Sequence, residues 1–136
     1  MPRHVRLALA ASIAFFLPAC GGLDGLGPTP FDEGVIFYIH ADFSGSSQQI
    51  NADVSDLGDV EGPCGIASDD SEPTWDDCIS SIRVLPGWGA TVFEDDEFRG
   101  GRIEITADTP DLRTLRGPCD DDSYNDCISS IRVYRR

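Results

Sequence analysis

Short runs of apolar residues, some of them alternating with polar ones, recur along the chain from about residue 35 onward. Apolar runs occupy residues 35–39 and 91–93, and residues 102–106 show the clearest alternation. A two-residue period places one face of a strand on a core. The runs are rich in Val, Ile, Thr and aromatic residues, and 14 Gly and 9 Pro interrupt the chain. This pattern predicts an all-β fold of short strands joined by turns.

The chain also contains an internal repeat, which is visible when the sequence is aligned with itself. The first copy carries six extra residues before its last aligned segment. The matching segments are 34–57 with 89–112, 62–64 with 117–119, and 75–84 with 124–133. One unit has therefore been duplicated.

Each copy predicts four short strands, the last at residues 79–84 in the first copy and 128–133 in the second. The apolar alternation there is imperfect by one position, so we expect Asp-Cys-Ile-Ser-Ser to be a loop entering the strand. A copy of about fifty residues buries too little surface to fold alone. The two copies, residues 34–85 and 89–136, are therefore expected to pack face to face as one sandwich.

The amino terminus has the pattern of an export signal. Arg3, His4 and Arg6 precede an apolar run at 7–17, which is too short to span a bilayer. The run ends in Leu-Pro-Ala-Cys20, which resembles the lipobox of bacterial lipoproteins. The resemblance implies a signal peptide at 1–19 and lipidation of Cys20.

The anchor prediction leads to a location. Residues 20–33, rich in Gly, Pro and Asp, would then be the lipidated cysteine and a flexible tether. The expected location is the cell envelope, at the outer membrane or cell surface if the host has two membranes. An ordinary secretory signal cleaved nearby is the alternative.

Two short signatures occur at matching positions of the two copies. The first is Tyr38-x4-Phe43-x-Gly45, repeated as Phe93-x4-Phe98-x-Gly100. It predicts a hairpin folded onto itself, with ring against ring and Gly where the backbone needs positive φ. The second is Asp-Asp-Cys-Ile-Ser-Ser at 76–81, repeated as Asn-Asp-Cys-Ile-Ser-Ser at 125–130.

Together these signatures resemble those of the microbial βγ-crystallin family. That family carries a folded hairpin of this form and the stretch Asn/Asp-Asn/Asp-x-x-Ser/Thr-Ser in each Greek-key motif. The resemblance extends from Gly34 to the end of the chain. It implies an all-β sandwich of two four-stranded Greek-key motifs, with a calcium-binding role that is structural or at the cell surface.

The resemblance also implies two Ca²⁺ ions held in a double clamp between the motifs. Calcium takes about six to eight hard oxygen ligands, and no EF-hand spacing is present. An Asx or Ser turn without any metal is the alternative interpretation. The implied side-chain ligands are Asp77, Ser80, Asp126 and Ser129, and the implied main-chain ligands are Asp76, Asn125, Ala41 and Asp96. The Cys at the third position departs from the family pattern and affects the expected affinity.

The charge balance agrees with a cation ligand. Ten arginines and no lysine face 24 acidic residues, for a net charge of −14. Because nucleic acids need clustered basic residues, they are excluded as partners. We expect the acidic run at 94–97 to belong to the neighbourhood of the first calcium site and the run at 120–122 to be surface.

Four cysteines, Cys64, Cys78, Cys119 and Cys127, remain after Cys20 is set aside. In an exported domain they are expected to form disulfides. Three pairings are possible, and Cys64–Cys78 with Cys119–Cys127 is favoured because duplication of one bridged unit produces it. A zinc site is disfavoured because the paired short spacing is missing.

An enzyme is not expected. Beyond the signal the chain has one histidine, His40, in a predicted loop, and no catalytic triad or cleft is suggested. The alternative to a calcium-binding module is a binding or inhibitory module, resembling crystallin-like protease inhibitors or toxins. It would act through the loop at residues 65–74, where the first copy is longer.

Overall fold

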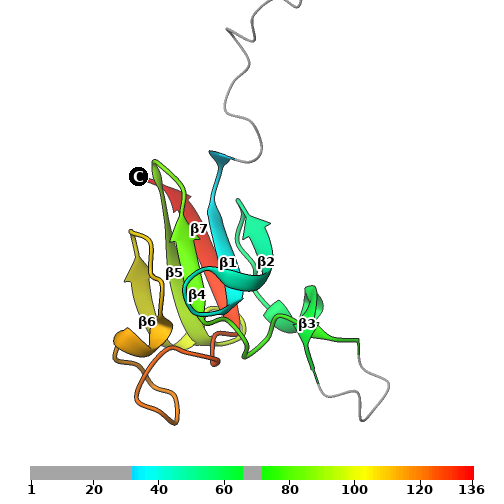
Figure 1. Cartoon of the computed structure of the whole chain (residues 1–136). Coiled ribbons are helices and arrows are strands. Elements are labelled where there is room, and N and C mark those ends of the chain that lie inside the picture. The colour runs from blue at the N-terminus through cyan, green and yellow to red at the C-terminus, as the bar shows by residue number, and fades with distance from the viewer. Residues whose placement is uncertain (1–31, 66–71) are drawn as a thin grey trace, which may run out of the picture.

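The computed structural model describes residues 32–65 and 72–136, which form two antiparallel sheets (Figure 1). The strand orders are β2-β1-β4 and β6-β5-β7. The elements are β1 (Val35–His40), β2 (Ser44–Ile50), η2 (Leu57–Asp59), β3 (Glu61–Cys64), β4 (Ser81–Val84), β5 (Trp88–Asp95), β6 (Arg99–Ile105), η3 (Leu112–Thr114) and β7 (Ser130–Arg135). The predicted all-β sandwich of two motifs is confirmed.

A short segment of each motif pairs with the sheet of the other motif. Val54 of the first motif bridges Ile131 on β7, with N–O distances of 2.8 and 2.9 Å. Thr109 of the second motif bridges Ile82 on β4, with distances of 2.8 and 3.0 Å. These crossings are the Greek-key connections, and they tie both halves into one unit.

The core lies between the two sheets. Val35 and Phe37 of β1 are fully buried against it, as are Val92 of β5 and Ile131 of β7. Leu57 and Leu112, one in each 3₁₀ turn, are also fully buried. Because each turn begins with an Asp whose carboxylate accepts a backbone N–H, the turn is capped and holds its leucine inward.

The strand bounds differ in detail from the sequence pattern. β4 and β7 begin at Ser81 and Ser130, so Asp-Cys-Ile-Ser forms the loop entering each strand, as the imperfect alternation predicted. The third strand expected in each motif, ahead of the closing strand, is much reduced. In the first motif β3 pairs through isolated bridges to Thr74, and in the second only the bridge Arg116–Ser123 remains of it in the described chain. A prolyl nitrogen donates no ladder hydrogen bond, and Pro63 or Pro118 stands in each of these segments.

Two predicted regions fall largely outside the described residues. They are the signal peptide and Cys20 with most of the tether, within residues 1–31, and most of the 65–74 loop, at residues 66–71. Within the described parts of the chain, no helix has the length and apolar character needed to cross a membrane.

Candidate metal centre between the motifs

Each motif contains a hairpin that folds back on itself. The ring centroids of Tyr38 and Phe43 lie 5.7 Å apart at 63°, and those of Phe93 and Phe98 lie 5.6 Å apart at 65°. Gly45 has φ of 79° and Gly100 has φ of 77°, a region that side chains with a Cβ disfavour. The hairpins therefore have the ring pair and the glycine conformation that the first signature predicts.

The second serine of each Ser-Ser pair fixes a hairpin. The Ser81 hydroxyl donates to the His40 carbonyl at 2.6 Å and accepts the Phe43 N–H at 3.1 Å. Both serines are fully buried, and Ser130 repeats the contacts with the Asp95 carbonyl and Phe98 N–H at the same two distances. One hydroxyl thus satisfies two backbone groups of the loop that carries a candidate main-chain ligand.

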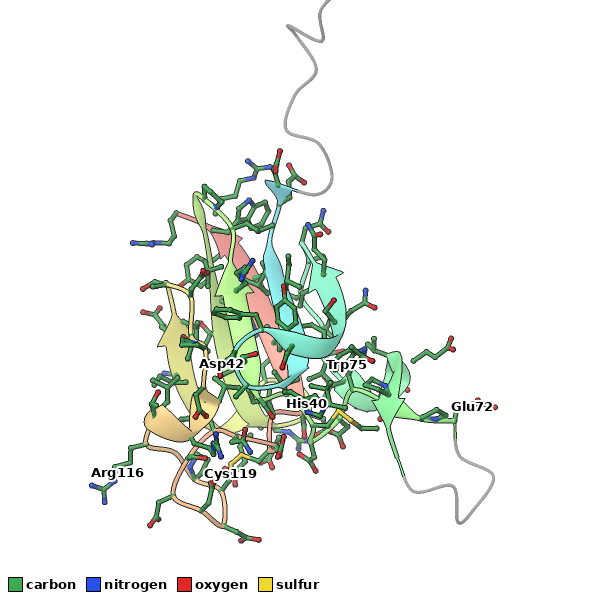
Figure 2. All side chains as sticks on the ribbon, in the orientation of Figure 1. His40, Asp42, Glu72, Trp75, Arg116 and Cys119 are labelled. Atoms are coloured by element: carbon green, nitrogen blue, oxygen red, sulfur yellow. A yellow bond between two sulfur atoms is a disulfide. The ribbon has the colours of Figure 1, made fainter. Side chains whose placement is uncertain are left out.

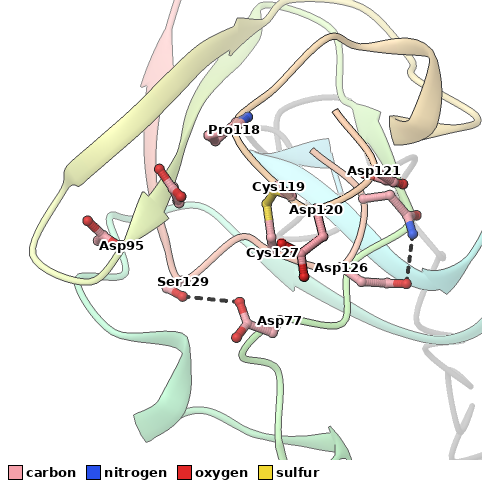
Figure 3. A pocket seen from close by; sticks show the side chains of 11 residues that line it. Asp77, Asp95, Pro118, Cys119, Asp120, Asp121, Asp126, Cys127 and Ser129 are labelled. Atoms are coloured by element: carbon pink, nitrogen blue, oxygen red, sulfur yellow. Dashed lines mark hydrogen bonds between the residues drawn. A yellow bond between two sulfur atoms is a disulfide. The ribbon is translucent and has the colours of Figure 1, made fainter. Parts of the chain in front are cut away.

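The first serine of each pair contacts the other motif. The Ser80 hydroxyl donates to Asp126 Oδ1 at 3.0 Å. The Ser129 hydroxyl donates to Asp77 Oδ1 at 3.4 Å, as Figure 3 shows. Backbone contacts accompany both pairs, because Asp126 N–H donates to the Ile79 carbonyl at 3.1 Å and Asp77 N–H donates to that of Ile128 at 3.3 Å. The four predicted side-chain ligands therefore form two reciprocal pairs across the motif boundary.

We name these pairs by position. Site one contains Ser80 and Asp126 beside the first hairpin, and site two contains Ser129 and Asp77 beside the second hairpin. The backbone supports both, because Ser80 N–H donates to the Tyr38 carbonyl at 2.9 Å and Ser129 N–H donates to the Phe93 carbonyl at 3.0 Å. Each site thus combines a serine and a hairpin of one motif with an aspartate of the other.

Both aspartates have an uncommon backbone conformation. Asp77 has φ of 54° and Asp126 has φ of 52°, the left-handed region that Asp and Asn tolerate better than most residues. The reversal places each side chain against the opposite motif. This local geometry explains why Asp suits the second position of each Asp-Cys-Ile-Ser-Ser stretch.

The charges around site two are not balanced by the protein alone. Burial raises the pKa of Asp77, the neighbouring carboxylates of Asp76 and Asp126 raise this pKa further, and the Ser129 hydrogen bond lowers it. Asp76 Oδ1 is buried and accepts no hydrogen bond within the described structure. A buried acceptor without a donor and a destabilised carboxylate are both relieved by a bound cation.

The candidate main-chain ligands differ between the hairpins. The Ala41 carbonyl accepts the Ser44 hydroxyl at 2.8 Å, whereas the Asp96 carbonyl accepts Arg99 Nε–H at 3.3 Å. Arg99 also forms an ion pair with the Asp96 carboxylate. Sequence reasoning missed Arg99, although its place in the repeat, opposite Ser44, was a signal that could have found it.

The first residue of each Asp/Asn-Asp pair lies close to the second. The Asn125 side-chain N–H donates to Asp126 Oδ2 at 2.7 Å (Figure 3), and its backbone N–H donates to Ser123 Oγ at 3.0 Å. Asp76 N–H donates to Thr74 Oγ1 at 3.3 Å. These contacts hold the main chain of both candidate ligands beside their sites.

An open pocket joins the two sites. It is lined by Asp77 and Ser129 of site two, by Asn125 and Asp126 beside site one, and by Glu94 and Asp95 of the acidic run (Figure 3). Asp120 and Asp121, which we expected to be plain surface, also line it. A second hollow touches Ser129, Asp96, Arg99 and Asp76. The acidic run 94–97 therefore adjoins site two, where the first site was expected.

The donor chemistry suits calcium better than a transition metal. Carboxylate, hydroxyl and carbonyl oxygens are hard ligands, and the described residues include no group of three or more His, Cys, Asp or Glu placed to hold an ion. A site that depends on serine and main-chain oxygens lacks such a group by its nature. The residues present therefore fit a calcium ion at each site.

The cysteines lie next to the aspartates of both sites. Cys64 is joined to Cys78, with Cα atoms 6.2 Å apart, and Cys119 is joined to Cys127, with Cα atoms 6.1 Å apart. This is the local pairing that the duplication favoured. Because Cys78 follows Asp77 and Cys127 follows Asp126, each bridge restrains the loop that presents a candidate ligand.

The fold and the repeated loops define a Greek-key domain of two motifs, and similar proteins are known. Spherulin-3A of Physarum polycephalum is 31% identical over 119 residues, covering 86% of this chain and 94% of the relative. A structure from work on the evolution of the eye-lens βγ-crystallin domain fold is 29% identical, with a TM-score of 0.59 over 82% of this chain and 95% of the other.

A βγ-crystallin domain from Flavobacterium johnsoniae is 26% identical, with a TM-score of 0.54 over 75% of this chain and 94% of the other. No family model matches the chain. On the strength of the relative and the shared fold, the chain belongs to the microbial βγ-crystallin family.

Proposed function

We propose that this chain is an exported, membrane-tethered module that binds two calcium ions in a double clamp between its motifs. The observation that carries the proposal is the reciprocal pairing of Ser80 with Asp126 and of Ser129 with Asp77. Each pair brings a neutral hydroxyl and a carboxylate together at the motif boundary. The role is one of binding and structure, with no catalytic step.

Both side chains and backbone carbonyls of this chain would coordinate the calcium ions. Asp77 and Asp126 would supply the charged oxygens, Ser80 and Ser129 the hydroxyls, and the rest would come from main-chain oxygens. Those are the carbonyls of Ala41, Asp96, Asp76 and Asn125. A bound ion supplies positive charge and oxygen coordination shared by both motifs.

Calcium would therefore stabilise the folded chain. An ion that binds the native state alone adds RT ln(1 + [Ca²⁺]/Kd) to the free energy of unfolding. The buried Asp76 Oδ1 without a donor and the raised pKa of Asp77 support this, because both describe negative charge that the metal-free protein leaves uncompensated.

A calcium titration tests the clamp. Calorimetry of the oxidised protein should detect about two ions per chain, and millimolar calcium should raise the melting temperature. The Ser80→Ala, Ser129→Ala double variant should fold but bind much more weakly. The control is Ser46→Ala, an exposed serine on β2 that belongs to neither site. If calcium produces no heat and no thermal shift, the motifs are structural turns and the proposal fails.

The tether would present the calcium-binding end away from the membrane. β1 begins at the end of the sandwich that also carries the C terminus (Figure 1). His40 and Cys119, which adjoin sites one and two, lie at the opposite end (Figure 2). Mass spectrometry of the mature amino terminus should find a lipidated Cys20, and Cys20→Ser should release the protein from the membrane fraction. An unmodified terminus after a different cleavage site would remove the tether from the proposal.

A further inference from the structure

The two hairpins offer different donors to equivalent main-chain oxygens. In the first hairpin the Ala41 carbonyl accepts a neutral hydroxyl from Ser44 at 2.8 Å. In the second, the Asp96 carbonyl accepts Nε–H of the Arg99 guanidinium at 3.3 Å. Ser44 and Arg99 occupy the same position in the repeat. A positive charge therefore lies on one candidate calcium ligand and is missing from its counterpart.

We infer that Arg99 acts as an internal cation that competes with calcium for site two and makes the two sites bind in sequence. The inference rests on the proposed calcium clamp. Arginine stays charged at every physiological pH, and the Asp96 carboxylate holds the guanidinium in place through an ion pair. For calcium to reach the Asp96 carbonyl, the Nε–H hydrogen bond breaks and the guanidinium moves away.

The surroundings of Arg99 explain why it sits there. Glu94, Asp95, Asp96 and Glu97 crowd the second hairpin, and Asp77 lies beside it in site two. Without a metal, a nearby cation lowers the mutual repulsion of these carboxylates. Arg99 is largely exposed, with 66% of its side-chain surface accessible, so it exchanges readily with solvent. It can stabilise the metal-free hairpin and still yield to a divalent ion.

Site one has an arginine nearby, but that arginine is held elsewhere. Arg113 interacts electrostatically with Asp126, although its main partner is Asp111. Its guanidinium donates to both carboxylate oxygens of Asp111, at 2.8 to 3.2 Å. In the described structure it donates no side-chain hydrogen bond to a candidate ligand. Site one is therefore expected to fill first, and site two only at higher calcium.

The test isolates one site at a time with calorimetric titrations of calcium chloride. Ser80→Ala removes the site-one hydroxyl and leaves site two to be measured. Adding Arg99→Ser to this variant should tighten site two about tenfold, because one opposing charge is removed beside a largely exposed ion. In the Ser129→Ala variant, the same Arg99→Ser change should leave the affinity of site one unaltered.

Two further variants separate charge from shape. Arg102→Ser removes the same charge from the same strand, at a residue that pairs with Phe93. Among the described residues, its side chain forms no hydrogen bond or ion pair with a candidate ligand. This substitution should change the site-two affinity much less. Arg99→Lys keeps the positive charge without the planar fork, and it should keep site two weak. If lysine tightens site two as serine does, charge competition is wrong.

A metal-free measurement completes the test. In chelator, the Arg99→Ser variant should melt at a lower temperature than the unsubstituted protein. In saturating calcium, the variant should melt at the higher temperature. The Arg99 Nε–H resonance should also shift when site two fills. Equal site-two affinities with and without Arg99→Ser would overturn the inference while leaving the clamp intact. If the unsubstituted protein binds no calcium, both the clamp and the inference fall.

Discussion

The two hairpin regions share one backbone design and carry different charges. The Ser81–His40 and Ser130–Asp95 hydrogen bonds are both 2.6 Å long, and the ring pairs differ by 0.1 Å in centroid distance (5.7 and 5.6 Å). The hairpin tips differ in sequence. The first motif has His40-Ala41-Asp42 where the second has Asp95-Asp96-Glu97. The first tip therefore carries one acidic residue and the second carries three.

This difference shows which residues set the loop and which are free to vary. The buried serine and the glycine are the same in both copies, and both ring positions are aromatic, because each satisfies a backbone or packing requirement. The tip side chains point toward solvent or the candidate sites, and their identity does not alter the hairpin. Ligand affinity can therefore diverge between the copies while the fold stays constant.

The largest expected contrast between the motifs lies in their aromatic anchors. Trp75 is 2% exposed and meets Phe37 edge to face at 4.8 Å, whereas the repeat partners are Tyr124 and Val92, which has no ring. Trp75→Ala should cost about 3–5 kcal/mol of unfolding free energy. The loss in Trp75→Ala should exceed the loss in Tyr124→Ala by about 1 kcal/mol, because Trp75→Ala also removes the ring pair with Phe37. Urea denaturation in chelator measures both, and a larger loss at Tyr124 would contradict the comparison.

Substitution of the two buried serines should cost the two motifs the same amount of unfolding free energy. Ser81→Ala and Ser130→Ala each leave a backbone N–H and a carbonyl without a partner, so each should cost about 1–3 kcal/mol. Denaturation of the metal-free protein should give nearly equal values. Ser80→Ala and Ser129→Ala are the matched controls, because their hydroxyls contact an aspartate of the other motif. They should cost less in chelator and weaken calcium binding at one site each. A marked inequality between Ser81 and Ser130 would show that the hairpins are not equivalent.

The smallest expected effect concerns the arginines above the hairpin rings. Arg83 lies 4.4 Å from the ring centroid of Phe43, and Arg132 lies 4.3 Å from that of Phe98. Exposed cation–π contacts contribute about 0.5–1 kcal/mol, so Arg83→Ala and Arg132→Ala should each lower stability by about that amount. Thermal melts of the two alanine variants would check this, with Arg83→Lys and Arg132→Lys as controls that keep the positive charge. Losses well above this range would point to a packing role for the side-chain stems.

Some of this architecture could be predicted from sequence because duplication doubles each signal. The hairpin rings and the late start of β4 and β7 follow from motifs found twice. The four side-chain ligands at the boundary were implied by the family resemblance. The weakness of the third strands was harder to see, since prolines disrupt them locally. Arg99 was missed because a repeat comparison draws attention to what the copies share. Its effect depends on what they do not share.

The reciprocal contacts also follow an approximate two-fold arrangement of the motifs. Val54 to Ile131 repeats as Thr109 to Ile82, and Ser80 to Asp126 repeats as Ser129 to Asp77. A single motif paired with an identical copy of itself would make each of these contacts twice, across a two-fold axis. Joining both copies in one chain removes the need for identity. Only then can a residue such as Arg99 appear on one side of the boundary without appearing on the other.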